Sequence, residues 1–182
     1  ITNMKDVCIK FGHKLHSMFI RPLYQKTNTK VNRKPKMNRQ RLREQLIQDE
    51  GVVYEIYKDH LGYKTFGVGH LVKRTDEEYD WEVGTPVSED RVWSAFDEDL
   101  DIAINDCLAL YDDFEAWPAE VQEVLVNMVF NLGRTGLSKF IMFRSALEEN
   151  DWRLAAQYGR DSLWYRQVTN RAERLMSRLE AI

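Results

Sequence analysis

One segment with strand character, residues 53–70, limits what this chain can fold into. It has the sequence VYEIYKDHLGYKTFGVGH, two aromatic and β-branched runs joined by Asp-His-Leu-Gly, which is the pattern of a β-hairpin. Asp59 ends the first run, and Thr65 lies on the returning one. The flanking segments have helical periodicity, so we expect a small sheet within a mostly helical protein.

A helix is predicted on each side of the hairpin. Asn38 can cap the first, Gly51 stands where helices commonly end, and Glu50 therefore falls in the last turn. Its apolar face comprises Leu42, Leu46 and Ile47. Ser88 caps the second, which is long and amphipathic. Its apolar stripe comprises Val92, Phe96, Leu100, Ala103, Ile104, Cys107 and Leu108.

Further helices are predicted in the last third of the chain. One opens at Pro118 and stops at Gly133, another runs through Phe140 and Leu147, one is capped by Asp151, and the last spans residues 169–182. The order of elements predicts an α+β fold, with a small β-hairpin lobe and a larger helical lobe joined by the long helix.

Charge divides the chain into two parts. Residues 1–41 hold 11 Lys/Arg and one acidic residue, whereas residues 42–182 hold 15 Lys/Arg and 28 acidic residues. The segment around residues 25–36 is polar, has no hydrophobic period and is typical of a solvated linker. We therefore expect a basic N-terminal arm, residues 1–37, and a folded domain, residues 38–182.

Several classes of protein are disfavoured by the sequence. The apolar runs are too short to span a bilayer, and Cys8 and Cys107 lack the spacing of a zinc site or a disulfide framework. Gly67 and Gly69 form only half of a nucleotide-binding fingerprint, so close approach of a ligand to the backbone is the better interpretation. No metal or organic cofactor is expected.

Three stretches carry a resemblance to a known family. Residues 49–71 (DEGVVYEIYKDHLGYKTFGVGHL), 127–140 (NMVFNLGRTGLSKF) and 164–175 (WYRQVTNRAERL) resemble the signature stretches of the T4-type phage lysozymes, the muramidases of glycoside hydrolase family 24. The resemblance covers about residues 40–182. It implies a lysozyme-like fold with Glu50, Asp59 and Thr65 as catalytic residues.

Hydrolysis of a glycosidic bond needs one protonated carboxylic acid and one carboxylate on opposite sides of the sugar. Glu50, at a helix C-terminus, faces the negative end of the helix dipole, which favours the protonated form. The resemblance pairs it with Arg171, which favours the ionised form, so the sequence leaves the balance open. By resemblance, Asp59 and Thr65 handle the attacking water and the reaction inverts the anomeric configuration. Carboxyl groups roughly 6.5–9.5 Å apart would suit that route.

The resemblance also implies accessory residues, each with a plainer alternative. Leu71 and Phe130 match positions that line the saccharide cleft, although interlobe packing is equally open. Phe143 and Tyr158 occupy cleft positions that are polar in the family's best-known member, which suggests stacking in place of hydrogen bonds. His70 invites a role as general base, but an ion pair with Asp99 on the long helix is the better interpretation.

The sequence thus predicts a peptidoglycan hydrolase of phage origin, either an endolysin or a virion-associated lysozyme. We expect it to be made in the host cytoplasm or carried in the virion, and to act on the host cell wall in the periplasm. A monomer is expected unless the chain is part of a larger virion protein. Two alternatives stay open. The fold could be an idle wall-binding module, or the arm, residues 1–37, could bind anionic membranes or wall polymers. Sequence-specific nucleic-acid binding is not expected, because the arm has few aromatic residues for base stacking.

Overall fold

The computed structural model describes residues 36–182, so the expectations for the arm before Lys36 lie outside the described residues. The fold is α+β, as predicted. The first half contains α1 (Arg39–Glu50), β1 (Val53–Lys58), β2 (Lys64–Gly67), β3 (His70–Leu71), η1 (Glu77–Asp80), α2 (Glu89–Leu110) and η2 (Phe114–Ala116). The second half contains α3 (Ala119–Leu137), α4 (Ile141–Glu148), α5 (Trp152–Arg160), α6 (Leu163–Gln167) and α7 (Thr169–Glu180).

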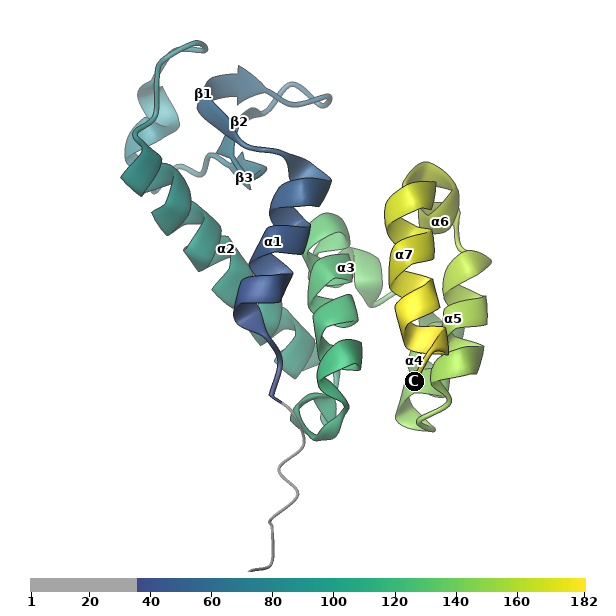
Figure 1. Cartoon of the computed structure of the whole chain (residues 1–182). Helices are drawn as coiled ribbons and strands as arrows, with labels where there is room; N and C mark the ends of the chain where they lie inside the picture. The colour runs from purple at the N-terminus through teal and green to yellow at the C-terminus, as the bar shows by residue number, and fades with distance from the viewer. Residues whose placement is uncertain (1–35) are drawn as a thin grey trace, which may run out of the picture. The chain divides into compact units, whose positions relative to one another are not determined.

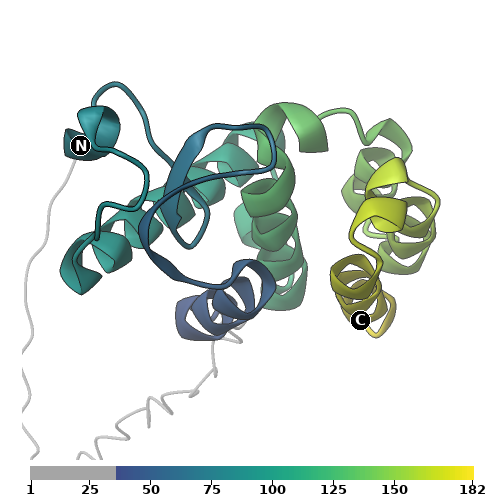
Figure 2. The same ribbon diagram turned by 90° about the horizontal axis from the view of Figure 1, so that it is seen from above.

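The sheet lies at one end of α1 and α2, and α4 to α7 lie beyond α3 (Figures 1 and 2). Its strands follow the antiparallel order β1-β2-β3, and an irregularity in β1 separates the pairs Val53–Gly67 and Tyr57–Thr65. The outer edge of β1 bonds to the segment before α2, since Ile56 donates to Thr85 O at 2.9 Å and Val87 donates to Tyr54 O at 2.8 Å. This segment and the short β3 extend the predicted hairpin into a lobe.

Two apolar clusters form the core, and α2 contributes to both. The small cluster lies under the sheet and comprises Ile56, Phe66, Val87, Val92 and Ala95. The large cluster includes Phe96 and Leu100 of α2 together with Leu42 and Leu46 of α1 and the apolar faces of α3 to α7. The long helix therefore joins the two lobes, as predicted, and α1 packs with the helical lobe.

Helix ends follow the local chemistry of the sequence. The side chains of Asn38, Ser88 and Asp151 each accept a hydrogen bond from a backbone amide in the first turn of their helices. Gly133 breaks α3, with φ of 68°, where the sequence predicts an end, but helical structure resumes to Leu137. Among residues 36–182, no helix combines the length and apolar character needed to cross a membrane.

Candidate active site

Glu50 is the last residue of α1, and the backbone turns away at Gly51, whose amide donates to Ile47 O at 2.9 Å. Arg171 of α7 donates from Nη1 to Glu50 Oε1. The Glu50 side chain keeps 24% of its surface exposed. A Cβ atom at Gly69 would lie 3.9 Å from Glu50 Oε2, so the turn between β2 and β3 lies against this carboxylate. Glu50 is thus held from one side and open to solvent on another.

Asp59 follows β1 directly, and its carboxylate is fixed by the turn that it begins. Asp59 Oδ1 accepts from the amides of Leu61 and Tyr63 at 2.9 and 2.8 Å. Within residues 36–182, no hydrogen bond or ion pair involves Asp59 Oδ2. One oxygen is therefore used to orient the group, and the other is available to a ligand.

Thr65 lies on β2 and is 4% exposed. Its hydroxyl donates to Tyr63 O at 3.2 Å, and the Tyr63 amide is one of the two that hold Asp59. The backbone of Tyr63 therefore couples Asp59 to Thr65. The structure brings these two predicted site residues together by this link.

Tyr57 is a site residue that sequence reasoning missed. It pairs with Thr65 across β1 and β2, so both side chains lie on the same face of the sheet. Burial raises the pKa of Tyr57, and the negative charges of Glu50 and Asp59 raise it further. The Tyr57 hydroxyl is thus within electrostatic reach of both carboxylates. Tyr57 precedes Asp59 by two residues, and residues two apart in a strand point to the same face of the sheet, which was a signal in the sequence. The register that pairs Tyr57 with Thr65 could not be deduced from the loop sequence.

One cavity is lined by Glu50, and a second lies nearby. One of about 520 Å³ is lined by Glu50, Asp49 and Asn131 together with residues 167–171 and Arg174. Another, of about 210 Å³, includes Gly69, Leu71 and Phe130. Gly69, which lines the second cavity, also lies against the Glu50 carboxylate. Leu71 and Phe130 are thus placed in one hollow near Glu50.

Phe143 and Tyr158 line a third cavity, of about 560 Å³ and mainly apolar, in the helical lobe. It shares Gln167 with the cavity beside Glu50. Phe143 is 1% exposed and packs edge-on against Phe140, so little of its ring faces the hollow. Tyr158 is half-buried, which leaves more of its ring accessible than that of Phe143.

His70 is engaged at both ring nitrogens. Nδ1 lies 2.7 Å from Asp99 Oδ2 and Nε2 lies 3.2 Å from Asp76 Oδ2, and the side chain is 3% exposed. Burial opposes the charged ring, but the hydrogen bonds and charges of Asp99 and Asp76 outweigh it and raise the pKa of His70. The ring joins the sheet to α2 and has no nitrogen left for a water molecule, which favours the structural interpretation over general base.

The structure thus places one carboxyl group at a helix end, a second at a strand end, and hollows beside the small sheet and within the helical lobe. These features fit a lysozyme-type hydrolase. The chain belongs to the phage lysozyme family, whose sequence model matches residues 47–181.

Individual relatives agree with this assignment. The pre-baseplate central spike protein Gp5 of Enterobacteria phage T4 is 32% identical over 151 residues, covering 72% of this chain and 26% of that protein. The probable T4-type lysozyme 2 of Dictyostelium discoideum is 30% identical over 158 residues, covering 76% of this chain and 93% of that protein. The peptidoglycan hydrolase gp36 of Pseudomonas phage phiKMV is 28% identical, covering 75% of this chain and 15% of that protein. The chain thus matches a small part of the two phage relatives and nearly all of the Dictyostelium lysozyme.

Proposed function

We propose that this chain is an N-acetylmuramidase that hydrolyses the β-1,4 bond between N-acetylmuramic acid and N-acetylglucosamine in bacterial peptidoglycan. The observation that carries the proposal is the pair formed by Glu50, held by Arg171 and partly exposed, and Asp59, which keeps one oxygen without a hydrogen bond or ion pair within residues 36–182. The charges of both reach the half-buried Tyr57, which supports their facing one space.

In the proposed reaction, Glu50 gives its proton to the glycosidic oxygen as the bond to the anomeric carbon of N-acetylmuramic acid breaks. A water molecule held by Thr65 and Asp59 attacks that carbon from the opposite face. Asp59 either acts as base and accepts the proton of this water, or stays ionised and stabilises the developing positive charge while the proton passes to solvent. The product is the inverted anomer. Leu71 and Phe130 offer apolar surface to the sugar faces, and Tyr158 contributes a wall of the neighbouring hollow, with Phe143 behind it.

Substitution of Glu50 by Gln tests the acid. We expect the variant to lose roughly 10²- to 10⁴-fold in the release of reducing ends from purified peptidoglycan, because the amide cannot supply the proton. Thermal unfolding should change little. Glu44→Gln, on the exposed face of the same helix, is the matched control and should retain activity. Turnover retained by Glu50→Gln would refute the assignment of the acid.

Mass spectrometry of the digested peptidoglycan decides between reaction types. Reducing N-acetylmuramic acid ends are expected for hydrolysis. Anhydro ends would indicate a lytic transglycosylase, and intact glycan that pellets with the protein would indicate an idle wall-binding module. The anomer formed first, read by NMR, distinguishes inversion from retention.

The proposed setting is a phage lysozyme that acts on the host wall, as an endolysin or as a module of a virion protein. The similarity to part of a phage spike protein supports the second setting. We further propose that residues 1–37 form a basic arm that contacts anionic wall polymers or membranes, because they contrast in charge with the acidic domain, residues 38–182.

A further inference from the structure

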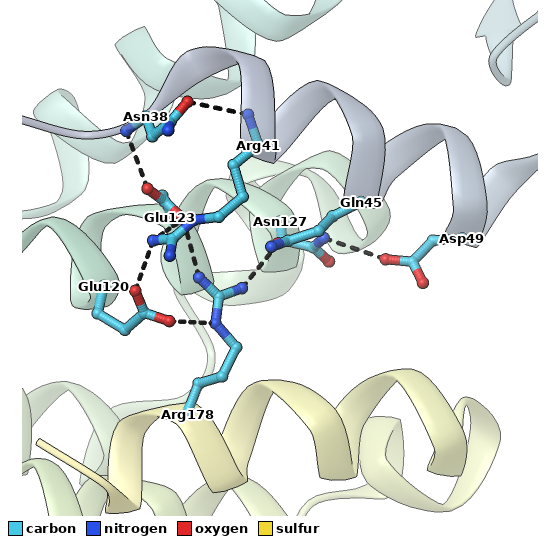
Figure 3. A network of polar contacts seen from close by, with 8 residues as sticks. All are labelled: Asn38, Arg41, Gln45, Asp49, Glu120, Glu123, Asn127 and Arg178. Atoms are coloured by element: carbon cyan, nitrogen blue, oxygen red, sulfur yellow. Dashed lines mark hydrogen bonds and ion pairs between the residues drawn. The ribbon is translucent and has the colours of Figure 1, made fainter.

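We propose that Asn127 is a positioning residue for the candidate acid and acts on Glu50 through Arg171. The inference rests on the function proposed above for Glu50. Asn127 lies on α3, is fully buried and contacts both helices that carry the acid and its arginine, α1 and α7. Figure 3 shows its link to Asp49 of α1.

Asn127 takes up two of the three nitrogens of the Arg171 guanidinium. Arg171 Nε donates to Asn127 Oδ1 at 2.8 Å, and Nη2 donates to the Asn127 carbonyl oxygen at 3.1 Å. The remaining nitrogen, Nη1, donates to Glu50 Oε1. Because the guanidinium is a planar and rigid fork, fixing two nitrogens also fixes the direction of the third. Asn127 therefore directs Arg171 at Glu50.

The orientation of the Asn127 amide is itself fixed. Nδ2 donates to Asp49 Oδ2 at 3.1 Å, and the side chain of Asp49 is 4% exposed and paired with Arg174. The position needs one acceptor that faces Arg171 and one donor that faces Asp49. An asparagine supplies both, a leucine supplies neither, and an ionised aspartate supplies only the acceptor.

Asn127 also keeps Arg171 from a competing partner. Arg171 Nε already lies 3.5 Å from Asp49 Oδ2, so a guanidinium released from Asn127 can turn toward Asp49 and away from Glu50. The charged and titratable groups around Glu50 are Arg171 and Arg174 of α7, Asp49 of α1, and Tyr57 and Asp59 at β1. Of these, Arg171 is the cation in contact with Glu50.

A second polar cluster on the same three helices provides a control. Arg178 of α7 donates to Gln45 of α1 at 2.7 Å and contacts Glu120 and Glu123 of α3 (Figure 3). This cluster joins the same three helices as the first and includes the buried Glu123, although Gln45 itself is half-buried, and it does not contact Arg171 or Glu50. Gln45→Leu therefore removes an interhelical hydrogen bond without touching the positioning of the acid.

The test compares Asn127→Leu, Asn127→Asp and Gln45→Leu in the full chain, with each rate referred to the folded protein measured by circular dichroism. We expect Asn127→Leu to lose about 10- to 100-fold in kcat with a KM within about 3-fold of the unaltered protein. Asn127→Asp keeps the acceptor for Arg171 but loses the donor to Asp49, so it should lose less kcat than Asn127→Leu. The alkaline limb of kcat should move to higher pH, because a less well placed Arg171 favours the ionised acid less. Gln45→Leu should lower only the unfolding temperature. Asn127→Asp is close to isosteric and keeps the test readable if Asn127→Leu does not fold.

A second readout does not depend on turnover. In protein labelled with ¹³C at glutamate carboxyl carbons, the Glu50 signal is the one missing from Glu50→Gln. We expect its titration midpoint to rise in both Asn127 variants and to stay in place in Gln45→Leu. An unchanged midpoint together with an unchanged kcat would overturn the role of Asn127. An unaltered protein that releases no reducing ends would refute the proposed function alone, and the ¹³C titration would still decide whether Asn127 positions Arg171.

Discussion

At His70, both ring nitrogens face carboxylates, so its contribution to stability depends on pH. The pKa of His70 is raised above 6.5, and this contribution is complete below pH 6.5 and is lost as the pH rises through the raised value. Burial opposes the charge of Asp76, but the Lys73 amide and His70 lower its pKa from 3.8. Its contribution is therefore present above pH 3.8 and is lost at lower pH. The triad stabilises the fold most between these limits.

His70→Asn should consequently destabilise the protein more at mildly acidic pH than at alkaline pH. We expect a loss of about 1.5–3 kcal/mol near pH 5.5, the value of hydrogen bonds to charged groups. A smaller loss is expected at about pH 9, above the ordinary pKa of His. Urea unfolding at both pH values measures the difference. His60→Asn, at the exposed tip of the hairpin, is the control and should have little effect at either pH. An equal loss by His70→Asn at both pH values would contradict the charged triad.

At the scale of elements, the helical lobe depends on the close crossing of α5 and α7. A Cβ atom at Gly159 would lie 2.0 Å from Met176 Sδ, and Met176 is fully buried. Gly159→Ala should therefore destabilise the protein by about 1–3 kcal/mol, although alanine has the higher helix propensity. Chemical denaturation measures this loss. The double variant Gly159→Ala with Met176→Ala should lose less unfolding free energy than the sum of the two single variants. A rise in stability for Gly159→Ala alone would show that the crossing is not tight.

Local chemistry made the longer elements predictable from the sequence. Asn38, Ser88 and Asp151 are helix caps that act within one turn, and the predicted starts at these residues are confirmed. The short elements β3 and α6 were missed, because two and five residues are too few to display a period. The last helix ends at Glu180, two residues before the predicted end, as helix termini often do.

The predictability of the site divides in the same way. Glu50 and Asp59 could be proposed from the sequence because their spacing within one segment is a recognisable motif. Asn127 and Asp49 were not assigned a role, because their contacts join residues 78 and 44 positions apart in the chain. Tyr57 was missed because the irregularity in β1 sets the register. Pairings of this kind depend on how helices and strands pack, and a single sequence carries no direct signal of that packing.

At the scale of the whole molecule, the division of charge makes a testable contribution to wall binding. Residues 42–182 carry an excess of 13 acidic over basic residues, and anionic wall polymers repel such a surface. The arm carries the opposite charge. The described domain begins near Asn38, whose amide donates to the buried Glu123 at 2.9 Å, so removal of residues 1–35 leaves this anchor intact.

Deletion of residues 1–35 should weaken binding to walls that carry anionic polymers, measured by pelleting, by roughly 10-fold at about 50 mM salt. The loss should become smaller as the salt concentration rises, because screening weakens both the attraction of the arm and the repulsion of the domain. Walls stripped of these polymers should bind both forms equally. Replacement of Lys26, Lys30 and Lys34 by Gln removes charge without shortening the chain and should give part of the same loss. Equal pelleting of the shortened and full chains at every salt concentration would show that the charge of the arm has no part in binding. The domain alone would then have to overcome the repulsion through its saccharide contacts.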